Sequence, residues 1–561
     1  MSYDQAWTKV QADRAKASKV LDSEKANVED IKRVLADLTE LKKWCQSEGI
    51  RDIKDSSGSR AIYFQRFDIL VDQTIGFARL KDTSAVLTTL NELASSLTAP
   101  DSWLQGKDKT FFALYADMIQ FDQYIAKLLP NPEIDATIHN FRKQDPDFIF
   151  RGVPYVSKDV EAISLGDRVA GLSMIWSEAK YNFANFDLVK NLDWDASYQK
   201  FLPLVAAATD RYAYYNLLRE FIGLLHDGHS DIGLPRGLRL SKETRPTIPV
   251  MLVERKVVVW NDVAPEYQKL GLQKGDIIER IDGVDAVEYG NQKWGKLVSA
   301  STPQDREIRV FDYMLLGGQL GKSVSLETSG PSHTSKKVTV PRDGKLKPAA
   351  KKPFEFKLLP DGTAYFAFNT CENDIPSNEF VKLLPEVIKA GKLVIDCRMN
   401  GGGNSEVGYA ILSHLIDKKL KVNEWSTRVY RASFRVWSQG TAPHEDSNYV
   451  EPKGPYYSGP VAVLAGPRSF SAAEDFLSGF KLSKRGPIIG MPSGGSTGQP
   501  VSFSIPGGGW ARICTKRDRM GDGTEFVGVG VIPDIRVETT IDSIRNGKDI
   551  QLEAAINHLN K

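Results

Sequence analysis

Ser471 stands where an α/β protein can present a nucleophile. The run Val461 to Ala465 is short and apolar and is ended by Gly466-Pro467, which predicts a strand. Residues Ala472 to Phe480 carry apolar side chains at helical spacing, so Ser471 is expected at the N-terminus of a helix. Unpaired backbone N–H groups and the helix dipole stabilise developing negative charge at such a position. These features favour nucleophilic chemistry at Ser471.

The same four residues, Ser471 to Glu474, also fit a purely structural role. A serine followed three residues later by a glutamate is a capping box, in which the two side chains satisfy backbone N–H groups at the start of the helix. On this segment alone, capping is the better interpretation. A catalytic role therefore depends on chemically suitable residues elsewhere in the chain.

A glycine-rich run, Asp396 to Gly403, could stabilise an oxyanion. It follows the apolar residues Leu393 to Ile395, so it is expected at the carboxyl end of a strand, where open α/β sheets bind ligands. The run has neither GxGxxG nor GK[ST] spacing, which argues against a nucleotide site. Glycines allow backbone N–H groups to approach a substrate oxygen closely, and Gly402 and Gly403 are the candidates. The alternative is an ordinary tight turn.

His229 is the most plausible general base. It lies in the run Asp227-Gly-His-Ser230, where a glycine ends a predicted helix and small neighbours leave the ring accessible. His226 could form a metal pair with it, but no third ligand stands at zinc-site spacing, so we expect no metal and no cofactor. A surface or capping histidine is the structural alternative.

Two carboxylates near the C-terminus could orient the imidazole. Glu525 and Asp522 flank a predicted turn and strand, and either could accept the second N–H of a catalytic histidine. The signal is weak, because Asp-Gly turns are common and usually structural.

The overall composition excludes some partners. The chain has 561 residues, in which 73 Lys and Arg balance 71 Asp and Glu, so no global field favours nucleic acid or an anionic membrane. No window has the eighteen apolar residues of a membrane span, and the four cysteines lack CxxC spacing. The N-terminus lacks the layout of a secretory signal, so the chain as written is expected to be cytoplasmic, or exported if a leader has been removed.

The order of patterns predicts a multidomain α+β protein. Residues 1–145 show helical periodicity, as in Val28 to Trp44 and Thr110 to Leu129, and are expected to form a helical bundle. Residues 160–242 form a second helical segment that carries the histidine run. Residues 243–345 form a β-rich module. Residues 354–561 alternate strands and helices, which indicates an α/β core.

Together these motifs resemble the serine peptidases related to C-terminal processing protease and tricorn. The resemblance runs from about Arg168 to Glu538 and rests on four ordered blocks. The blocks are Asp227 to Ser230, Leu270 to Gly283, Asp396 to Gly403, and Ser471 to Glu474 with Gly528 to Asp534. Each block alone is modest, and their order makes the match specific.

The resemblance implies roles for individual residues. The β-rich module would be PDZ-like and would bind an extended peptide or chain terminus, with Leu270, Gly271 and Leu272 in the binding loop. Ser471 matches the nucleophile. The backbone N–H of Ala472, with that of Gly402 or Gly403, matches the oxyanion hole.

One departure selects a branch of the family. Processing proteases use a lysine about twenty-five residues beyond the serine, and Ser496 stands near that place in this chain. The tricorn-like branch uses a histidine and a late glutamate, which match His229 and Glu525. The expected function is therefore a serine peptidase with a Ser-His-Glu arrangement acting on extended or unfolded polypeptides.

Three other functions remain open on the sequence. The first is a catalytically inactive protein that binds a ligand or peptide on the same scaffold. The second is an α/β-hydrolase esterase, although the residues around Ser471 do not form GxSxG. The third is a PDZ adaptor.

Overall fold

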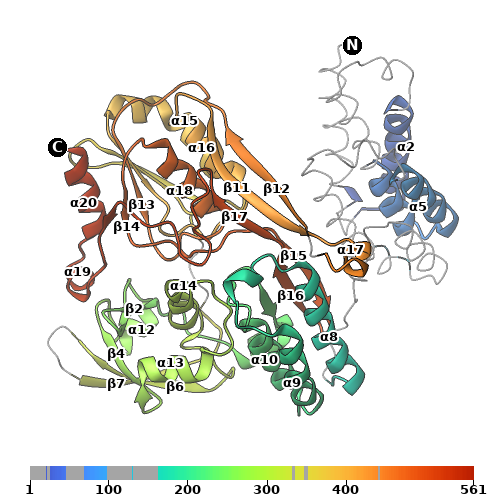
Figure 1. The fold of residues 1–561 in the computed structure, drawn as a ribbon, viewed down its shortest axis with the longest axis horizontal. Helices are drawn as coiled ribbons and strands as arrows, with labels where there is room; N and C mark the ends of the chain where they lie inside the picture. The colour runs from blue at the N-terminus through green and yellow to red at the C-terminus, as the bar shows by residue number, and fades with distance from the viewer. Residues whose placement is uncertain are drawn as a thin grey trace. The chain divides into compact units, whose positions relative to one another are not determined.

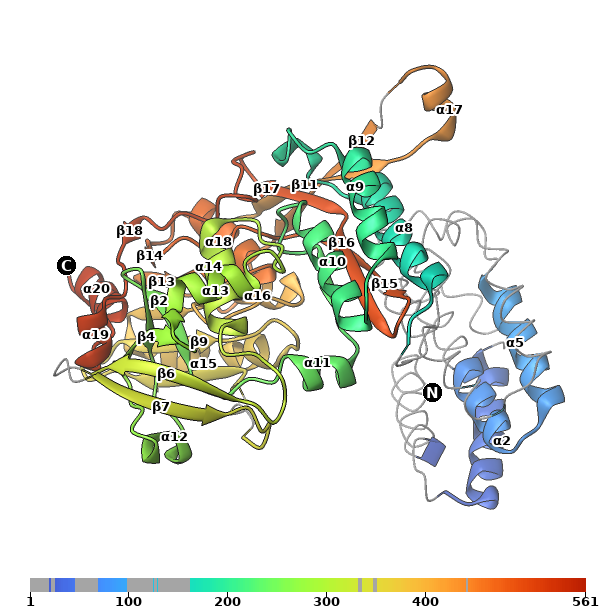
Figure 2. The same ribbon diagram turned by 90° about the horizontal axis from the view of Figure 1, so that it is seen from below.

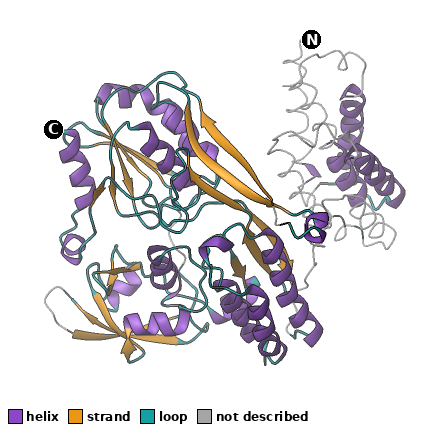
Figure 3. Cartoon of the chain, viewed as in Figure 1, coloured by secondary structure: helices purple, strands orange, loops and turns teal. Residues whose placement is uncertain are grey.

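The computed structural model describes residues 20–21, 26–45, 69–97, 125, 129, 162–330, 335–346, 351–439 and 442–561. The chain divides into two compact units, Met1–Pro154 and Tyr155–Lys561. Figure 3 shows helices among the described residues of the first unit and a mixture of helices and strands in the second. The multidomain α+β class is confirmed. The finer boundaries predicted within residues 160–561 stay predictions.

Most of the described residues of the first unit are helical. Helix α2 (Val28–Cys45) and helix α5 (Thr83–Leu97) flank a further helical stretch, residues 69–79. Buried apolar residues recur on one face of α2, at Ile31, Val34, Leu35, Leu38 and Leu41, which confirms the periodicity predicted there. The predicted helix Thr110 to Leu129 lies outside the described residues, apart from positions 125 and 129.

Helices open the second unit and pack on a small antiparallel sheet. They are α8 (Leu165–Asn182), η2 (Phe186–Leu188), α9 (Trp194–Ala206), α10 (Arg211–Gly223) and α11 (Arg236–Lys242). Ser164, Asp193 and Asp210 cap α8, α9 and α10 with their side chains. The sheet has the order β1 (Asp231–Gly233), β16 (Gly509–Cys514), β15 (Pro500–Ile505). This sheet joins the helical segment to the C-terminal part of the chain.

A β-rich module follows. Its strands are β2 (Val250–Val253), β3 (Lys256–Val259), β4 (Ile277–Ile281), β5 (Val284–Asp285), β6 (Ser323–Ser329) and β7 (Ser335–Pro341). The antiparallel order is β2-β3-β4-β6-β7, with β5 paired to β4, and β6 and β7 lie side by side in Figure 2. The helical elements are α12 (Pro265–Lys269), α13 (Ala286–Trp294), α14 (Pro303–Glu307) and the π-helix η3 (Ile308–Met314). Trp294 and Phe311 are buried in the module's core.

The C-terminal core is built on a six-stranded sheet. Its order is β18 (Ile535–Arg536), β14 (Ile488–Gly490), β13 (Val461–Ala465), β10 (Leu393–Asp396), β9 (Ala364–Phe368) and β8 (Phe354–Leu358). Every neighbouring pair is parallel except β8 with β9. Such a sheet needs helices on both faces, and its strands therefore read as continuous apolar runs.

Helices cover both faces of this sheet (Figure 1). Alternate strand residues such as Ile395 and Val463 pack in one cluster with α15 (Ile375–Ala390), α16 (Ser405–Ser413) and α18 (Ala472–Ser483). Their neighbours, such as Val394 and Leu464, pack against α20 (Ile550–Leu559), which follows α19 (Ile541–Arg545). The two-residue alternation along the strands explains this division.

A second, three-stranded sheet extends the core. It has the order β12 (Ala442–Val450), β11 (Leu420–Val429), β17 (Lys516–Met520). Strands β11 and β12 form the long orange hairpin of Figure 1, with α17 (Ala432–Val436) near its tip. The adjacent strand β17 follows β16 directly along the chain, so this region connects the two three-stranded sheets, β1-β16-β15 and β12-β11-β17.

The topology determines which loops meet. Strands β10, β13 and β14 are parallel neighbours, so their carboxyl ends lie at the same edge of the sheet. The glycine run follows β10, Ser471 follows β13, and residues 491–499 follow β14. The carboxyl edge of a parallel sheet is the usual place for a ligand site. None of the helices described here is long and apolar enough to cross a membrane.

Candidate active site

Ser471 occupies a strained turn between β13 and α18. Its backbone has φ 58° and ψ −125°, a conformation that non-glycine residues rarely adopt. The Ser471 Oγ lies 3.0 Å from Nε2 of His229. The Ser471 hydroxyl is therefore within hydrogen-bonding distance of a base, as nucleophilic chemistry requires.

His229 is buried, with 4% of its surface exposed, and its ring is packed on Phe470. The two ring centroids are 4.8 Å apart and the planes are tilted by 14°, a stacked arrangement. Phe470 immediately precedes Ser471, so one segment supplies both the nucleophile and the surface that orients the base. This packing restricts the imidazole to one plane.

The second ring nitrogen of His229 contacts Ser496. Nδ1 lies 2.8 Å from the Ser496 Oγ. If Nε2 accepts the Ser471 proton, Nδ1 must carry the ring hydrogen and donate it to Ser496. Hydrogen-bonding contacts therefore link Ser471 to His229 and His229 to Ser496. A hydroxyl occupies the place that an aspartate or glutamate fills in many catalytic triads.

Glu474 holds the loop that carries Ser496. One carboxylate oxygen accepts from Ser493 Oγ at 2.6 Å and from Gly495 N at 2.7 Å. The other accepts from Ser496 N at 2.9 Å and from Ser471 N at 3.1 Å. Burial raises the pKa of Glu474 to about 8, and these donors act against that rise. The glutamate of the predicted capping box thus joins the nucleophile to the loop that orients the base.

The histidine segment is fixed by Asp227. The Asp227 carboxylate accepts from His229 N and from Ser230 Oγ, both at 2.9 Å, and from Asn185 Nδ2 at 3.0 Å. No side chain fits at Gly228, since a Cβ there would lie 2.8 Å from Asp305 and 2.9 Å from Phe470. The Asp-Gly-His-Ser run is thus a rigid support for the imidazole.

The β-rich module contributes to the same support. Arg309 donates to Gly228 O at 2.9 Å, and Ser301 Oγ accepts from Gly228 N at 2.9 Å. Thr302 donates to Gly494 O at 2.7 Å, in the loop that carries Ser496. The module therefore holds both the segment of the base and the segment of its partner.

The glycine run lies against the nucleophile. A Cβ on Gly402 would lie 2.5 Å from Ser471 Cβ and 3.1 Å from Ala472 N, and the φ of Gly402 is 98°. Its N–H is already bound, at 2.9 Å, by Asn400 Oδ1. Within the described part of the chain, the N–H groups of Gly403 and Ala472 donate to no protein acceptor. Of the two predicted glycines, Gly403 is thus the one that can pair with Ala472 as an oxyanion donor.

Asn400 positions this turn from inside the protein. It is fully buried, and its side-chain amide donates to Phe368 O at 3.1 Å while its oxygen holds Gly402. Its own carbonyl accepts from Phe470 N at 3.0 Å, in the segment that carries the nucleophile. One asparagine therefore connects the glycine turn to the nucleophile turn.

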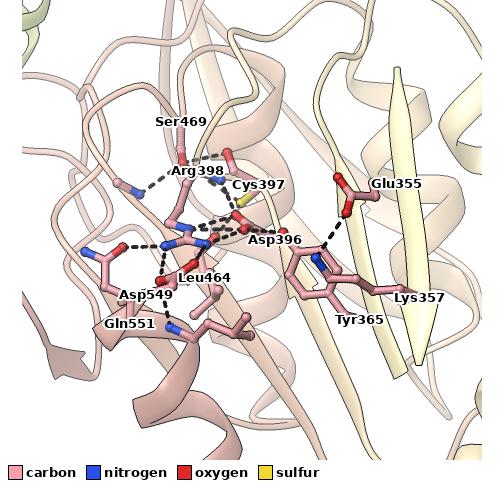
Figure 4. A network of polar contacts seen from close by, with 12 residues as sticks. Glu355, Lys357, Tyr365, Asp396, Cys397, Arg398, Leu464, Ser469, Asp549 and Gln551 are labelled. Carbon is pink, nitrogen blue, oxygen red and sulfur yellow. Dashed lines mark hydrogen bonds and ion pairs between the residues drawn. The ribbon is translucent and has the colours of Figure 1, made fainter. Parts of the chain in front are cut away.

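A polar network anchors the end of β10 (Figure 4). The Arg398 guanidinium binds both carboxylate oxygens of Asp396 and both of Asp549, at 2.6 to 3.1 Å. Gln551 accepts a further bond at 3.0 Å, and Tyr365 donates to Asp396 at 2.8 Å. The strand end that precedes the glycine turn is therefore tied to α20.

Ser469 completes the connection, at the top of the same view. Its hydroxyl donates to Cys397 O at 2.9 Å and accepts from Gly466 N at 3.1 Å. The turn between β13 and Ser471 is thus bound to the end of β10.

The surroundings of His229 keep the ring neutral. Burial, followed by the positive charges of Arg512, Arg309 and Lys516, holds the pKa of His229 well below its usual value near 6.5. A neutral imidazole can accept a proton, so the ring is in the form that a general base needs at neutral pH.

The two carboxylates predicted for the third position of the catalytic triad, Glu525 and Asp522, make other contacts. Both carboxylate oxygens of Glu525 pair with arginines: Oε2 is 2.9 Å from Arg517 and Oε1 is 2.7 Å from Arg519. Asp522 is exposed and accepts from Thr524 N in its own turn. The structure places Ser496, not these carboxylates, on the Nδ1 atom of His229.

The predicted peptide-binding loop follows α12. Leu270 is exposed and Leu272 is buried. The N–H groups of Leu270, Gly271 and Leu272 all donate to carbonyls of residues 267 and 268, and the Gly271 carbonyl accepts from Lys336. The turn therefore satisfies its own donors, and its role in substrate binding stays a prediction.

A pocket of about 510 Å³ opens over the nucleophile. Its lining includes His229, Ser471 and Gly403, together with three arginines, Arg309, Arg468 and Arg512. Within the described part of the chain, no group of three histidine, cysteine or acidic residues could hold a metal ion. Cys371, Cys397 and Cys514 are buried free thiols.

Sequence reasoning missed several of these residues. In the sequence, Ser496 marks only the place of an absent lysine, and Asp227 is only part of the histidine run. The roles of Asn400 and Arg512 had no local signal, because their partners lie far away along the chain.

Two family models match the chain. Residues 362–537 match peptidase family S41, and residues 172–223 match the tricorn protease C1 domain. No match was found among curated proteins. The resemblance to C-terminal processing proteases and tricorn is confirmed.

Several solved structures are similar to this chain at low identity, and the likeness to mature CPAF supports a shared fold. Mature CPAF has a TM-score of 0.55 at 16% identity, over 71% of this chain and 96% of CPAF. The photosystem II D1 C-terminal processing protease has a TM-score of 0.42 at 18% identity, over 68% of this chain and 98% of its own. The tricorn protease has a TM-score of 0.36 at 18% identity, over 70% of this chain and 36% of its own.

The fold and the site thus define an α/β hydrolytic core in which a serine hydroxyl lies within hydrogen-bonding distance of a histidine ring nitrogen. Residues 362–537 match the model of peptidase family S41, and the protein is a serine-type peptidase.

Proposed function

We propose that this peptidase cleaves polypeptides through an acyl-enzyme, with Ser471 as nucleophile, His229 as general base and Ser496 as the group that orients the base. The observation that carries the proposal is the 3.0 Å distance between Ser471 Oγ and His229 Nε2. This distance lies within the range over which a general base removes a proton.

The steps follow from the geometry. His229 takes the Ser471 proton as Oγ attacks the substrate carbonyl, and the ring then gives that proton to the leaving amine. A water activated by the same nitrogen hydrolyses the acyl-enzyme. The N–H groups of Gly403 and Ala472 stabilise the oxyanion, and losing one such donor typically costs about 2.7 to 4 kcal/mol.

The orienting group is a hydroxyl in this proposal. Glu525 is committed to two arginines, whereas Ser496 Oγ is 2.8 Å from Nδ1. The Glu474 carboxylate holds Ser496 in place by accepting a hydrogen bond from the Ser496 backbone N–H. A neutral partner keeps the ring tautomer but stabilises the imidazolium less than a carboxylate does.

The substrate is proposed to be an extended or unfolded polypeptide. Strand β15 is an edge of its sheet, and its first residue, Pro500, lines the pocket over Ser471. An extended chain can pair with a free strand edge while its carbonyl reaches the nucleophile.

Labelling with a fluorophosphonate tests the nucleophile. We expect the intact protein to be labelled on Ser471, and Ser471→Ala to lose both the label and hydrolysis of an unfolded protein such as casein. Lactacystin, which is bound in one structure of mature CPAF, offers a second probe. Absence of any Ser471-dependent label would instead favour the alternative, an inactive ligand- or peptide-binding protein on the same scaffold.

A further inference from the structure

Arg512 brings into the active-site pocket a positive charge that no carboxylate of the described residues neutralises, although the guanidinium lies 5.9 Å from the centre of the Trp510 ring. It lies on β16, it lines the pocket with Ser471, and its Nε is buried without a hydrogen-bond partner. Among the described residues its side chain makes one hydrogen bond, from Nη2 to Gly228 O, and that bond is 3.5 Å long. Asp231 stands opposite on β1, but within the described residues no carboxylate forms an ion pair with Arg512.

The other two arginines of the pocket are compensated. Arg309 binds Asp305 at 2.8 Å, and Arg468 binds Asp312. Both pairs are largely buried, so their charges cancel locally. Of the three arginines that line the pocket, Arg512 is therefore the one without a carboxylate partner among the described residues, and its Nε is an unused donor.

The chemistry at His229 makes this charge costly in the absence of a ligand. Arg512, Arg309 and Lys516 all oppose protonation of the ring, while catalysis requires the ring to become an imidazolium. A buried guanidinium donor without an acceptor is also unfavourable by itself. An anion beside Arg512 would relieve both effects.

We propose that the pocket beside Ser471 binds a carboxylate of the peptide substrate through Arg512. This inference rests on the proposed function and names its substrate class. The guanidinium is suited to a carboxylate because its planar donors can bind both oxygens. The carboxylate has two possible sources, an Asp or Glu side chain next to the cleaved bond or the C-terminal carboxylate of a short peptide.

Matched peptides separate the two sources. One internally quenched series carries Glu, Gln or Lys at the residue before or after the cleaved bond, with both ends blocked. A second series keeps Gln at those positions and ends, one or two residues beyond the bond, in a free acid or an amide. We expect kcat/KM to be roughly ten- to hundredfold higher for the member with the carboxylate, in whichever series matches the natural source.

Three variants attribute the preference to Arg512. Arg512→Gln is expected to reduce the preference to about twofold or less, and Arg512→Lys to restore part of it because the charge remains. Arg536→Gln is the control, since Arg536, at the end of β18, is exposed and pairs with Glu538. Melting curves show whether each variant is folded.

A binding measurement removes the dependence on turnover. Ser471→Ala protein is titrated with fluorescent forms of the same peptides, and anisotropy should show tighter binding of the carboxylate member. Equal binding and equal kcat/KM across both series would overturn the inference. If Ser471 is labelled by the fluorophosphonate in that case, the proposed peptidase mechanism survives; if it is not labelled, that mechanism fails separately.

Discussion

The Ser496 hydroxyl lies 2.8 Å from Nδ1 of His229, on the opposite side of the ring from Ser471. A neutral hydroxyl can fix the tautomer and the direction of the imidazole without adding negative charge. The surrounding cations and the burial then lower the pKa of the ring without opposition from a carboxylate at Nδ1.

Ser496→Ala should slow catalysis while the protein stays folded. It removes the acceptor of the Nδ1 hydrogen, which costs about 1 to 3 kcal/mol for a buried group, or roughly 5- to 150-fold in kcat. Glu525→Gln is the matched comparison and should change kcat by less than about threefold, because Glu525 contacts Arg517 and Arg519. Steady-state kinetics on one peptide measure both. The opposite ranking would return Glu525 to the role predicted from sequence.

Activity should persist below pH 6.5. The base works as neutral imidazole, and the folded-state pKa of His229 is well below 6.5, so the ring stays neutral where a free histidine would be protonated. The acid limb of kcat/KM should therefore lie below pH 6.5, and His229→Ala should abolish turnover. If the acid limb of kcat/KM is instead centred near pH 8 and disappears in Glu474→Gln, the group that controls activity is the Glu474 carboxyl and not His229.

Gly402→Ala should abolish most activity. The new methyl would lie 2.5 Å from Ser471 Cβ and 2.8 Å from Phe470 O, and the φ of 98° adds strain. Displacing the turn by a fraction of an ångström should cost at least one oxyanion donor, or roughly 100-fold in kcat. Gly166→Ala, in α8 and with its nearest neighbour 3.8 Å away, is the control and should keep full activity. Near-normal turnover in Gly402→Ala would show that this turn is not part of the site.

Arg398→Met should destabilise the core more than Asp549→Asn. Removing Arg398 leaves the Asp396 carboxylate, 8% exposed, without its cation, a change that typically costs about 3 to 5 kcal/mol. Asp549 is 42% exposed, so its loss should cost about 1 kcal/mol or less. Urea unfolding of the two variants gives the comparison. Equal losses would mean that Tyr365 and the backbone N–H of residue 398 satisfy Asp396 without the guanidinium.

Most of the fold was predictable because its signals are local. The apolar runs at 393–395 and 461–465 indicated buried strands, and the helical periodicity of Val28 to Trp44 and Ala472 to Phe480 indicated helices. The placement of Ser471 after a strand followed directly from such patterns. The choice between a cap and a nucleophile did not, because it depends on whether His229 comes within reach.

The sequence by itself determined the elements and the chemical types at the edge of the sheet: a serine after β13, glycines after β10 and a histidine after a helix. Only the tertiary structure decided which side chain contacts Nδ1 of His229, which N–H of the two glycines is already bound, and that Arg512 lines the same pocket as Ser471. The physical reason is the distance along the chain over which each interaction acts. Strand and helix patterns arise from neighbouring residues, whereas Ser496, Asn400 and Arg512 acquire their roles from packing between segments that lie far apart along the chain.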